Sequence, residues 1–191
     1  MYKIHMKFVL FGASGSGKST ILRMVSRLLE NTSIHKKDSD RDPRKTEDPN
    51  GELEMNFVKK VIKEDCDIVY HLYGHEYGVK KDQIIRAFEN KEIHFIIINE
   101  VSAIKQFKYM YPDAKAIYIH VDPKSLPENL KEREGIEVEE RRNRVIRQYQ
   151  EYLDNNTLFD HVILNFWELG NTSAQFRNIF HYYMRISTIN I

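Results

Sequence analysis

The chain of 191 residues has the length of one compact domain, and its 41% hydrophobic and 30% charged residues are typical of an ordinary globular protein. Lysine and arginine number 29 against 28 aspartates and glutamates, so the net charge of +1 gives no reason to expect binding to nucleic acid or to a membrane. The only cysteine, Cys66, excludes an internal disulfide and a cysteine-based zinc site. The apolar run near the N-terminus is shorter than the ~18 residues of a membrane span, so we expect a cytoplasmic protein.

Short apolar runs, each followed by a longer amphipathic stretch, alternate along the chain. The runs are residues 7–11, 68–73, 95–98, 116–121 and 162–164. Helices are expected after residue 20, where Ile21, Leu22, Val25, Leu28 and Leu29 share one face, and at 82–90, 102–110, 138–153 and 173–184. Because several runs are continuously apolar, we expect an α/β fold of three layers, with helices on both faces of a central parallel sheet of about five strands.

Two charged segments interrupt this alternation. Residues 36–54 contain Pro43 and Pro49 and show no periodicity, which predicts an exposed loop or a small flexible lobe. Residues 122–147 are also charged, but their scattered apolar positions indicate two helices that meet near Gly135. Such segments are natural candidates for mobile flaps in a phosphoryl-transfer enzyme, and solvated surface is the alternative interpretation.

One motif carries chemistry. The residues Gly12, Ala13, Ser14, Gly15, Ser16, Gly17, Lys18, Ser19 and Thr20 fit the pattern G-x-x-x-x-G-K-[ST] between the first predicted strand and its helix. The glycines allow a turn in which successive N–H groups face phosphate oxygens, and the helix N-terminus adds positive partial charge. We therefore expect ATP and Mg²⁺ as ligands, with Lys18 reaching the β and γ phosphates and the Ser19 hydroxyl binding Mg²⁺.

A triphosphate site alone does not distinguish switches, motors and kinases. A GTPase should carry an Asn-Lys-x-Asp segment after a strand, and the sequence has none, since residues 99–102 read Asn-Glu-Val-Ser. Motor ATPases are usually longer, so a small kinase is the remaining common class. Glu100 follows a predicted strand, where nucleotide-binding folds often place an acidic residue near the metal, and it is a candidate Mg²⁺ ligand.

The sequence at this point resembles the guanylate kinase family. The segments that carry the resemblance, in order, are the loop at 12–20, Arg-Asp-Pro-Arg-Lys-Thr-Glu at 41–47, Tyr77-Gly78, an arginine-bearing stretch at 130–144, and Phe-Asp-His-Val-Ile-Leu-Asn at 159–165. The resemblance implies one domain over residues 1–191. Its core would comprise residues 1–35, 66–121 and 156–191, with an acceptor-binding lobe at 36–65 and a helical lid at 122–150.

The resemblance also implies roles for single residues. Arg41, Arg44 and Tyr77 would bind the phosphate of a small acceptor, and guanidinium groups suit this task because they present planar donors. Arg133 and Arg144 would come from the lid and neutralise charge on the transferring phosphoryl group. The neighbouring arginines Arg141, Arg142 and Arg147 are alternatives for that role. Asn165 would lie near the adenine of ATP, and the acceptor's own phosphate oxygen would be the nucleophile.

The sequence departs from the family where the base of the acceptor is read. Lys37 stands for a serine, Ile68 for a glutamate, and Val79 and Lys80 for a Thr-Ser pair. Isoleucine cannot replace the hydrogen bonds of a carboxylate, although Asp67 is one residue away.

Three hypotheses remain. The first is an ATP-dependent kinase of a nucleoside monophosphate, with GMP as the first candidate. The second is a kinase of another phosphorylated small molecule, such as a sugar phosphate, which the lost base contacts favour. The third is a non-catalytic interaction module, against which the intact Lys18 and Ser19 argue.

Overall fold

A central sheet of five strands organises the protein. The computed structural model describes residues 6–29, 32–44, 47–48, 54–81, 93–125 and 138–189. The strands β1 (Met6–Phe11), β2 (Thr32–Ile34), β7 (Ile93–Ile97), β8 (Lys115–His120) and β9 (His161–Leu164) lie in the order β2-β7-β1-β8-β9. Every neighbouring pair is parallel, with Val9 of β1 beside Ile96 on one side and Ala116 on the other. The expected central parallel sheet is confirmed.

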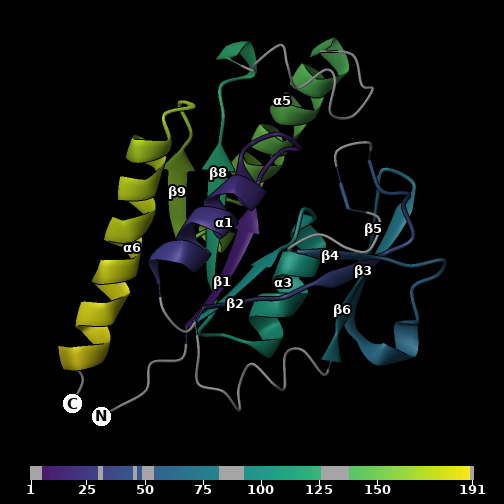
Figure 1. The fold of residues 1–191 in the computed structure, drawn as a ribbon, viewed down its shortest axis with the longest axis horizontal. Coiled ribbons are helices and arrows are strands. Elements are labelled where there is room, and N and C mark those ends of the chain that lie inside the picture. The colour runs from purple at the N-terminus through teal and green to yellow at the C-terminus, as the bar shows by residue number, and fades with distance from the viewer. Residues whose placement is uncertain are drawn as a thin grey trace.

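Helices cover both faces of this sheet, as Figure 1 shows. They are α1 (Lys18–Leu28), α3 (Val101–Met110), α5 (Val138–Asp154) and α6 (Leu169–Ile189). Phe8 and Leu10 of β1 belong to a core with residues of α1 and α6, whereas Val9 and Phe11 belong to a second core with residues of α3. Alternate side chains of one strand therefore enter two cores, which explains why residues 8–11 of β1 are continuously apolar.

A second, smaller sheet lies beside the central one (Figure 1). It contains β3 (Lys37–Ser39), β4 (Met55–Phe57), β5 (Cys66–Leu72) and β6 (His75–Lys80) in the order β4-β3-β6-β5. The strand expected at 68–73 therefore exists, but it pairs with β6 in the small sheet and not in the central one. Its expected place in the central sheet is taken by β2, whose three partly buried residues give no strand pattern in the sequence.

The predicted division of the chain at residue 65 falls inside the small sheet. β3 and β4 come before this position, and β5 and β6 come after it. Because a sheet folds as a unit of hydrogen-bonded strands, we propose that the whole segment from β3 to β6 forms the acceptor-binding lobe. The lid boundaries at 122–150 stay a prediction.

The helices predicted at 102–110, 138–153 and 173–184 are present as α3, α5 and the longer α6. Three aromatic residues of α6 belong to the core, because Phe176 and Phe180 are buried and Tyr183 packs against the same cluster. The helix expected at 82–90, the junction near Gly135 and the lid residue Arg133 lie outside the described residues. Within the part of the chain that is described, none of the helices combines the length and apolar character needed to cross a membrane.

Candidate active site

The phosphate-binding loop leaves the C-terminal end of β1 and enters α1. Gly15 and Gly17 have φ angles of 83° and 89°, a region that favours glycine. A Cβ on Gly12 would lie 2.7 Å from the carbonyl oxygen of Ile119, so this position admits no larger residue. A Cβ on Gly17 would lie 2.7 Å from Asn165 Nδ2. The glycines of the motif are therefore required by the local backbone and by close neighbours.

Lys18 lies at the first turn of α1, and its side chain is curled into the loop. Nζ donates to the carbonyl oxygens of Gly12 at 2.7 Å and Ala13 at 2.6 Å, and it lies 3.4 Å from Ser16 Oγ. The residue is 93% buried, with a relative exposure of 7%. The loop thus holds an ammonium group where the motif requires a cation for phosphate oxygens.

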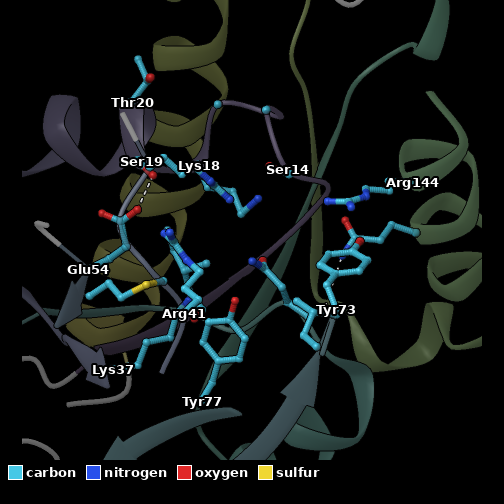
Figure 2. Close-up of a pocket in the computed structure, with 18 of the residues that line it drawn as sticks. Ser14, Lys18, Ser19, Thr20, Lys37, Arg41, Glu54, Tyr73, Tyr77 and Arg144 are labelled. Carbon is cyan, nitrogen blue, oxygen red and sulfur yellow. Dashed lines mark hydrogen bonds between the residues drawn. The ribbon is translucent and has the colours of Figure 1, made fainter. Parts of the chain in front are cut away.

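One pocket of about 180 Å³ joins this loop to the small sheet. The described residues that line it are Ser14, Gly15, Gly17, Lys18, Ser19, Thr20, Arg23, Lys37, Arg41, Arg44, Glu54, Met55, Leu72, Tyr73, Tyr77, Ile97, Asn99, Arg144, Gln148 and Trp167. Six of these side chains are lysine or arginine, and Glu54 is the only carboxylate among them. Such a lining favours a ligand of high negative charge. Figure 2 shows Lys18, Arg41, Tyr77 and Arg144 around this space.

The arginine pair of the small sheet is held by an acidic residue. Arg41 is buried and forms a bidentate ion pair with Glu47. Its Nη1 donates to Oε2 and its Nη2 donates to Oε1, each at 2.7 Å. The backbone N–H of Arg44 donates to the same carboxylate at 2.8 Å. Burial alone would raise the pKa of Glu47, but these hydrogen bonds hold it below its usual value. Glu47 therefore remains a charged carboxylate and fixes the orientation of Arg41.

Tyr77 of β6 lies next to this pair and lines the same pocket. Its ring stacks on Tyr70, with 5.1 Å between ring centroids and 11° between the planes. Only 7% of the residue is exposed, and burial raises the pKa of its hydroxyl. Tyr77 therefore stays protonated at neutral pH, as a donor to an acceptor phosphate would need to be.

Helix α5, which includes part of the predicted lid, contributes Arg144. Its guanidinium carbon lies 4.2 Å from the centroid of the Tyr73 ring, and Nη2 donates to Glu140 at 2.7 Å. Tyr73 belongs to the tight turn between β5 and β6, where its φ angle is 53°. This stacking joins α5 to the small sheet at the pocket that both residues line. The other described lid arginines with a placed side chain, Arg142 and Arg147, do not line it.

Sequence reasoning missed three polar residues of the pocket. Glu54 accepts a very short hydrogen bond from the Ser19 hydroxyl, drawn as a dashed line in Figure 2. Gln148 of α5 donates to the carbonyl oxygen of Asn99 at 3.3 Å. Buried Glu54 Oε2, Asn99 Oδ1 and Gln148 Oε1 have no hydrogen-bond partner within the described part of the chain. Gln148 lies four residues after Arg144, a helical spacing that could have indicated it; Glu54 had no such signal.

Two predicted residues have structural partners of their own. Asn165 Nδ2 donates to the Ser16 carbonyl oxygen at 3.0 Å, and Asn165 lines a second hollow of about 160 Å³ beside Gly17 and Trp167. Glu100 caps α3, accepting from the backbone of Ser102 at 3.0 Å and Ala103 at 2.7 Å. Asn165 thus lies beside the loop, whereas Glu100 is not among the described pocket residues. Roles in adenine binding and in Mg²⁺ binding stay predictions.

The described residues fit a magnesium ion bound together with a nucleotide. No group of three or more His, Cys, Asp or Glu side chains within the described ranges could hold a metal ion alone. Mg²⁺ prefers oxygen ligands and usually takes several from water and phosphates. The Ser19 hydroxyl and the unpaired oxygen of Glu54 supply such ligands on one side of the pocket.

Comparisons with known proteins agree with the fold. The family model described as "ABC transporter" matches residues 5–163, from just before β1 into β9. The crystal structure of guanylate kinase from Anaplasma phagocytophilum is similar, with a TM-score of 0.67 and 18% identity over 96% of this chain and 88% of that one. Shikimate kinase from Bacteroides thetaiotaomicron has a TM-score of 0.52 and 13% identity over 92% of this chain and 98% of that one. A search of curated proteins found no match.

Proposed function

Since this chain belongs to the P-loop family that the ABC transporter model describes, and has the fold of guanylate kinase, we propose that it is an ATP-dependent phosphotransferase. It binds ATP through residues 12–20 and transfers the γ-phosphoryl group to a small phosphorylated acceptor. A nucleoside monophosphate, with GMP first, is the acceptor that the sequence resemblance implies. Another nucleotide or a sugar phosphate is the alternative, and a non-catalytic interaction module is the weaker one.

The observation that carries this proposal is the continuity of the pocket. Lys18 and Ser19 of the loop, Arg41 and Arg44 of the small sheet, and Arg144 of the lid line one space. A protein that only hydrolyses ATP needs room for water, not a second arginine site facing the loop. Two cationic groups on opposite sides of one pocket suit a donor phosphate and an acceptor phosphate that meet in line.

The side chains would act by positioning and by charge. Lys18 would leave the carbonyl oxygens of the loop for the β and γ phosphates, while Arg41 and Arg44 hold the acceptor. Arg144 would stabilise charge that spreads over the transferring group. Mg²⁺, when bound with ATP at Ser19, would supply further neutralisation of phosphate charge. Closure of α5 over the small sheet would exclude water, which favours transfer over hydrolysis.

We expect the change Glu54→Gln to weaken Mg²⁺ binding. Glu54 holds the Ser19 hydroxyl and has a buried unpaired oxygen, so the neutral amide should lower metal affinity by roughly 10- to 100-fold. Electron paramagnetic resonance of Mn²⁺ in the presence of ATP measures this affinity without turnover. Glu64→Gln, at an exposed glutamate outside the pocket, is the control and should leave Mn²⁺ affinity unchanged. Equal affinities for all three proteins would remove Glu54 from the metal site.

Arg144→Ala should lower kcat by roughly 100-fold and change the KM for ATP little, because the contact is expected to strengthen in the transition state. The matched control is Arg142→Ala on the same helix, whose guanidinium contacts Glu139 at 3.3 Å and does not line the pocket. Steady-state ADP formation compares the two variants. A larger loss for Arg142→Ala would assign the transition-state role to that arginine instead.

The proposed function is tested by ADP formation from ATP and Mg²⁺ against GMP, dGMP, AMP, CMP, UMP, dTMP and ribose phosphates. Acceptor-dependent ADP formation supports the phosphotransferase. Equal ADP formation with and without any acceptor would instead favour an ATPase, which the family match also allows. Absence of ADP formation throughout, together with ATP binding unaffected by Lys18→Ala, would favour the interaction module.

A further inference from the structure

Lys37 is a buried cation in the floor of the pocket. It belongs to β3, has a relative exposure of 1%, and lines the pocket beside Arg41 and Tyr77. Figure 2 shows it on the small-sheet side, below Arg41. The three-residue strand β3 is held between β4 and β6, so the backbone that carries Lys37 is fixed on both sides.

The ammonium group of Lys37 has too few partners for its burial. Nζ donates to the carbonyl oxygen of Ile97 at 2.8 Å, and this is its one hydrogen bond to the described residues, although an ammonium has three donors. Nζ also lies 5.7 Å from the centroid of the Tyr77 ring. A buried charge with unsatisfied donors is unfavourable unless a counter-charge completes the site.

Among the described residues, no carboxylate forms an ion pair with the ammonium group of Lys37. Burial lowers the pKa of Lys37 to about 8; Glu54 opposes this shift, and Arg41 and Arg44 add to it. Glu54 acts on Lys37 through its charge without a hydrogen bond to it, and Glu47 is engaged with Arg41. The six lysine and arginine side chains that line the pocket outnumber Glu54, its one described carboxylate, so a ligand oxyanion can complete the site at Lys37.

The positions where the resemblance implies base recognition are closed to a ligand. Ile68 and Val79 face each other across β5 and β6, are 1% and 0% exposed, and belong to the hydrophobic core. Asp67, the nearby carboxylate that a register slip would bring in, lies at an irregularity of the pairing between Cys66 and Ile68. None of these three residues is among the described pocket residues. Among the positions where the resemblance implies base recognition, Lys37 is the one that lines the described pocket. Its side chain is a cation.

We infer that Lys37 is the acceptor-specificity residue, and that the acceptor is a compact phosphate ester whose second anionic group, a carboxylate or another phosphate, binds Lys37 Nζ. This inference rests on the proposed function, in which Arg41 and Arg44 take the first phosphate. The acceptor is compact because the same pocket of about 180 Å³ must also admit the γ-phosphate of ATP. The protein would then recognise an oxyanion of its acceptor, whereas a GMP kinase would recognise the edge of the purine base.

Matched probes that differ in one anionic group test the inference by calorimetry. The probes are 3-phosphoglycerate against glycerol 3-phosphate, and fructose 1,6-bisphosphate against fructose 6-phosphate, each with a non-hydrolysable ATP analogue and Mg²⁺. In at least one pair the protein should bind the doubly anionic compound roughly 10- to 100-fold more tightly, as a charge-assisted hydrogen bond implies. This preference should fall between pH 7 and pH 9 as Lys37 loses its proton beside Glu54, Arg41, Arg44 and Tyr77.

Three variants separate recognition from structure. Lys37→Met should lose the preference while its melting temperature stays equal or rises, because a buried charge is removed. Lys37→Arg should keep a preference, and Lys36→Met, at the neighbouring lysine outside the pocket, should behave as the unchanged protein. A preference that survives in Lys37→Met, or tighter binding of GMP than of every doubly anionic probe, would overturn the inference.

The outcome for the inference is separable from the outcome for the proposed function. A preference for the doubly anionic probes without any ADP formation would refute phosphoryl transfer and keep the anion site at Lys37. ADP formation with GMP, together with equal affinities inside both probe pairs, would keep the phosphotransferase and refute the inference.

Discussion

Lys18→Ala is expected to reduce ADP formation by roughly two to three orders of magnitude, the effect of removing a preorganised donor to transition-state charge. Lys18 Nζ lies within the loop on the carbonyl oxygens of Gly12 and Ala13, and the residue lines the pocket that phosphate oxygens would enter. The variant should remain folded, because the loop backbone is fixed by its glycines and by Asn165. Steady-state kinetics and circular dichroism measure the two properties.

The control for this experiment is Lys105→Ala, at an exposed lysine of α3 outside the pocket. It should keep the activity of the unchanged protein. Full activity in Lys18→Ala would contradict every role assigned to the phosphate-binding loop, including the ATPase alternative.

Arg41→Lys is expected to lower kcat/KM for the acceptor by roughly 100-fold while the KM for ATP changes less than about 2-fold. Arg41 meets Glu47 through two parallel contacts of 2.7 Å, and a lysine cannot reproduce this planar geometry. The lysine keeps the positive charge beside Glu47, whose side chain is only 14% exposed, so the variant should still fold. Separate titrations of ATP and acceptor measure the two constants.

Arg177→Lys provides the matched control, because this exposed arginine lies on α6 outside the pocket. Equal losses for ATP and acceptor in Arg41→Lys would indicate a general disturbance of the pocket. They would contradict the assignment of Arg41 to the acceptor side.

The sequence was sufficient to predict the loop at residues 12–20 and its flanking strand and helix, because these features are local. The loop is one continuous segment of the chain, and the strand before it and the helix after it follow from periodicity alone. The burial of both faces of β1 likewise follows from the unbroken apolar sequence of residues 8–11. These features depend on near neighbours in the chain, which a single sequence records.

The acceptor side could be predicted only in part because it depends on distant pairings. Glu54 meets Ser19 across 35 residues, and Lys37 meets Ile97 across 60, so no spacing rule connects them. The small sheet was partly missed because β3 and β4 are three-residue strands with polar members. The family resemblance places Lys37 where the family has a serine, but it does not indicate that the lysine is buried.

Phosphorus NMR of ATP, Mg²⁺ and an acceptor active in the ADP assay tests phosphoryl transfer most directly. The γ-phosphorus signal should disappear and a new signal of the phosphorylated acceptor should appear in equal amount, with little inorganic phosphate. Conversion of the γ-phosphorus signal into inorganic phosphate alone, with the acceptor unchanged, would contradict transfer and identify the protein as an ATPase.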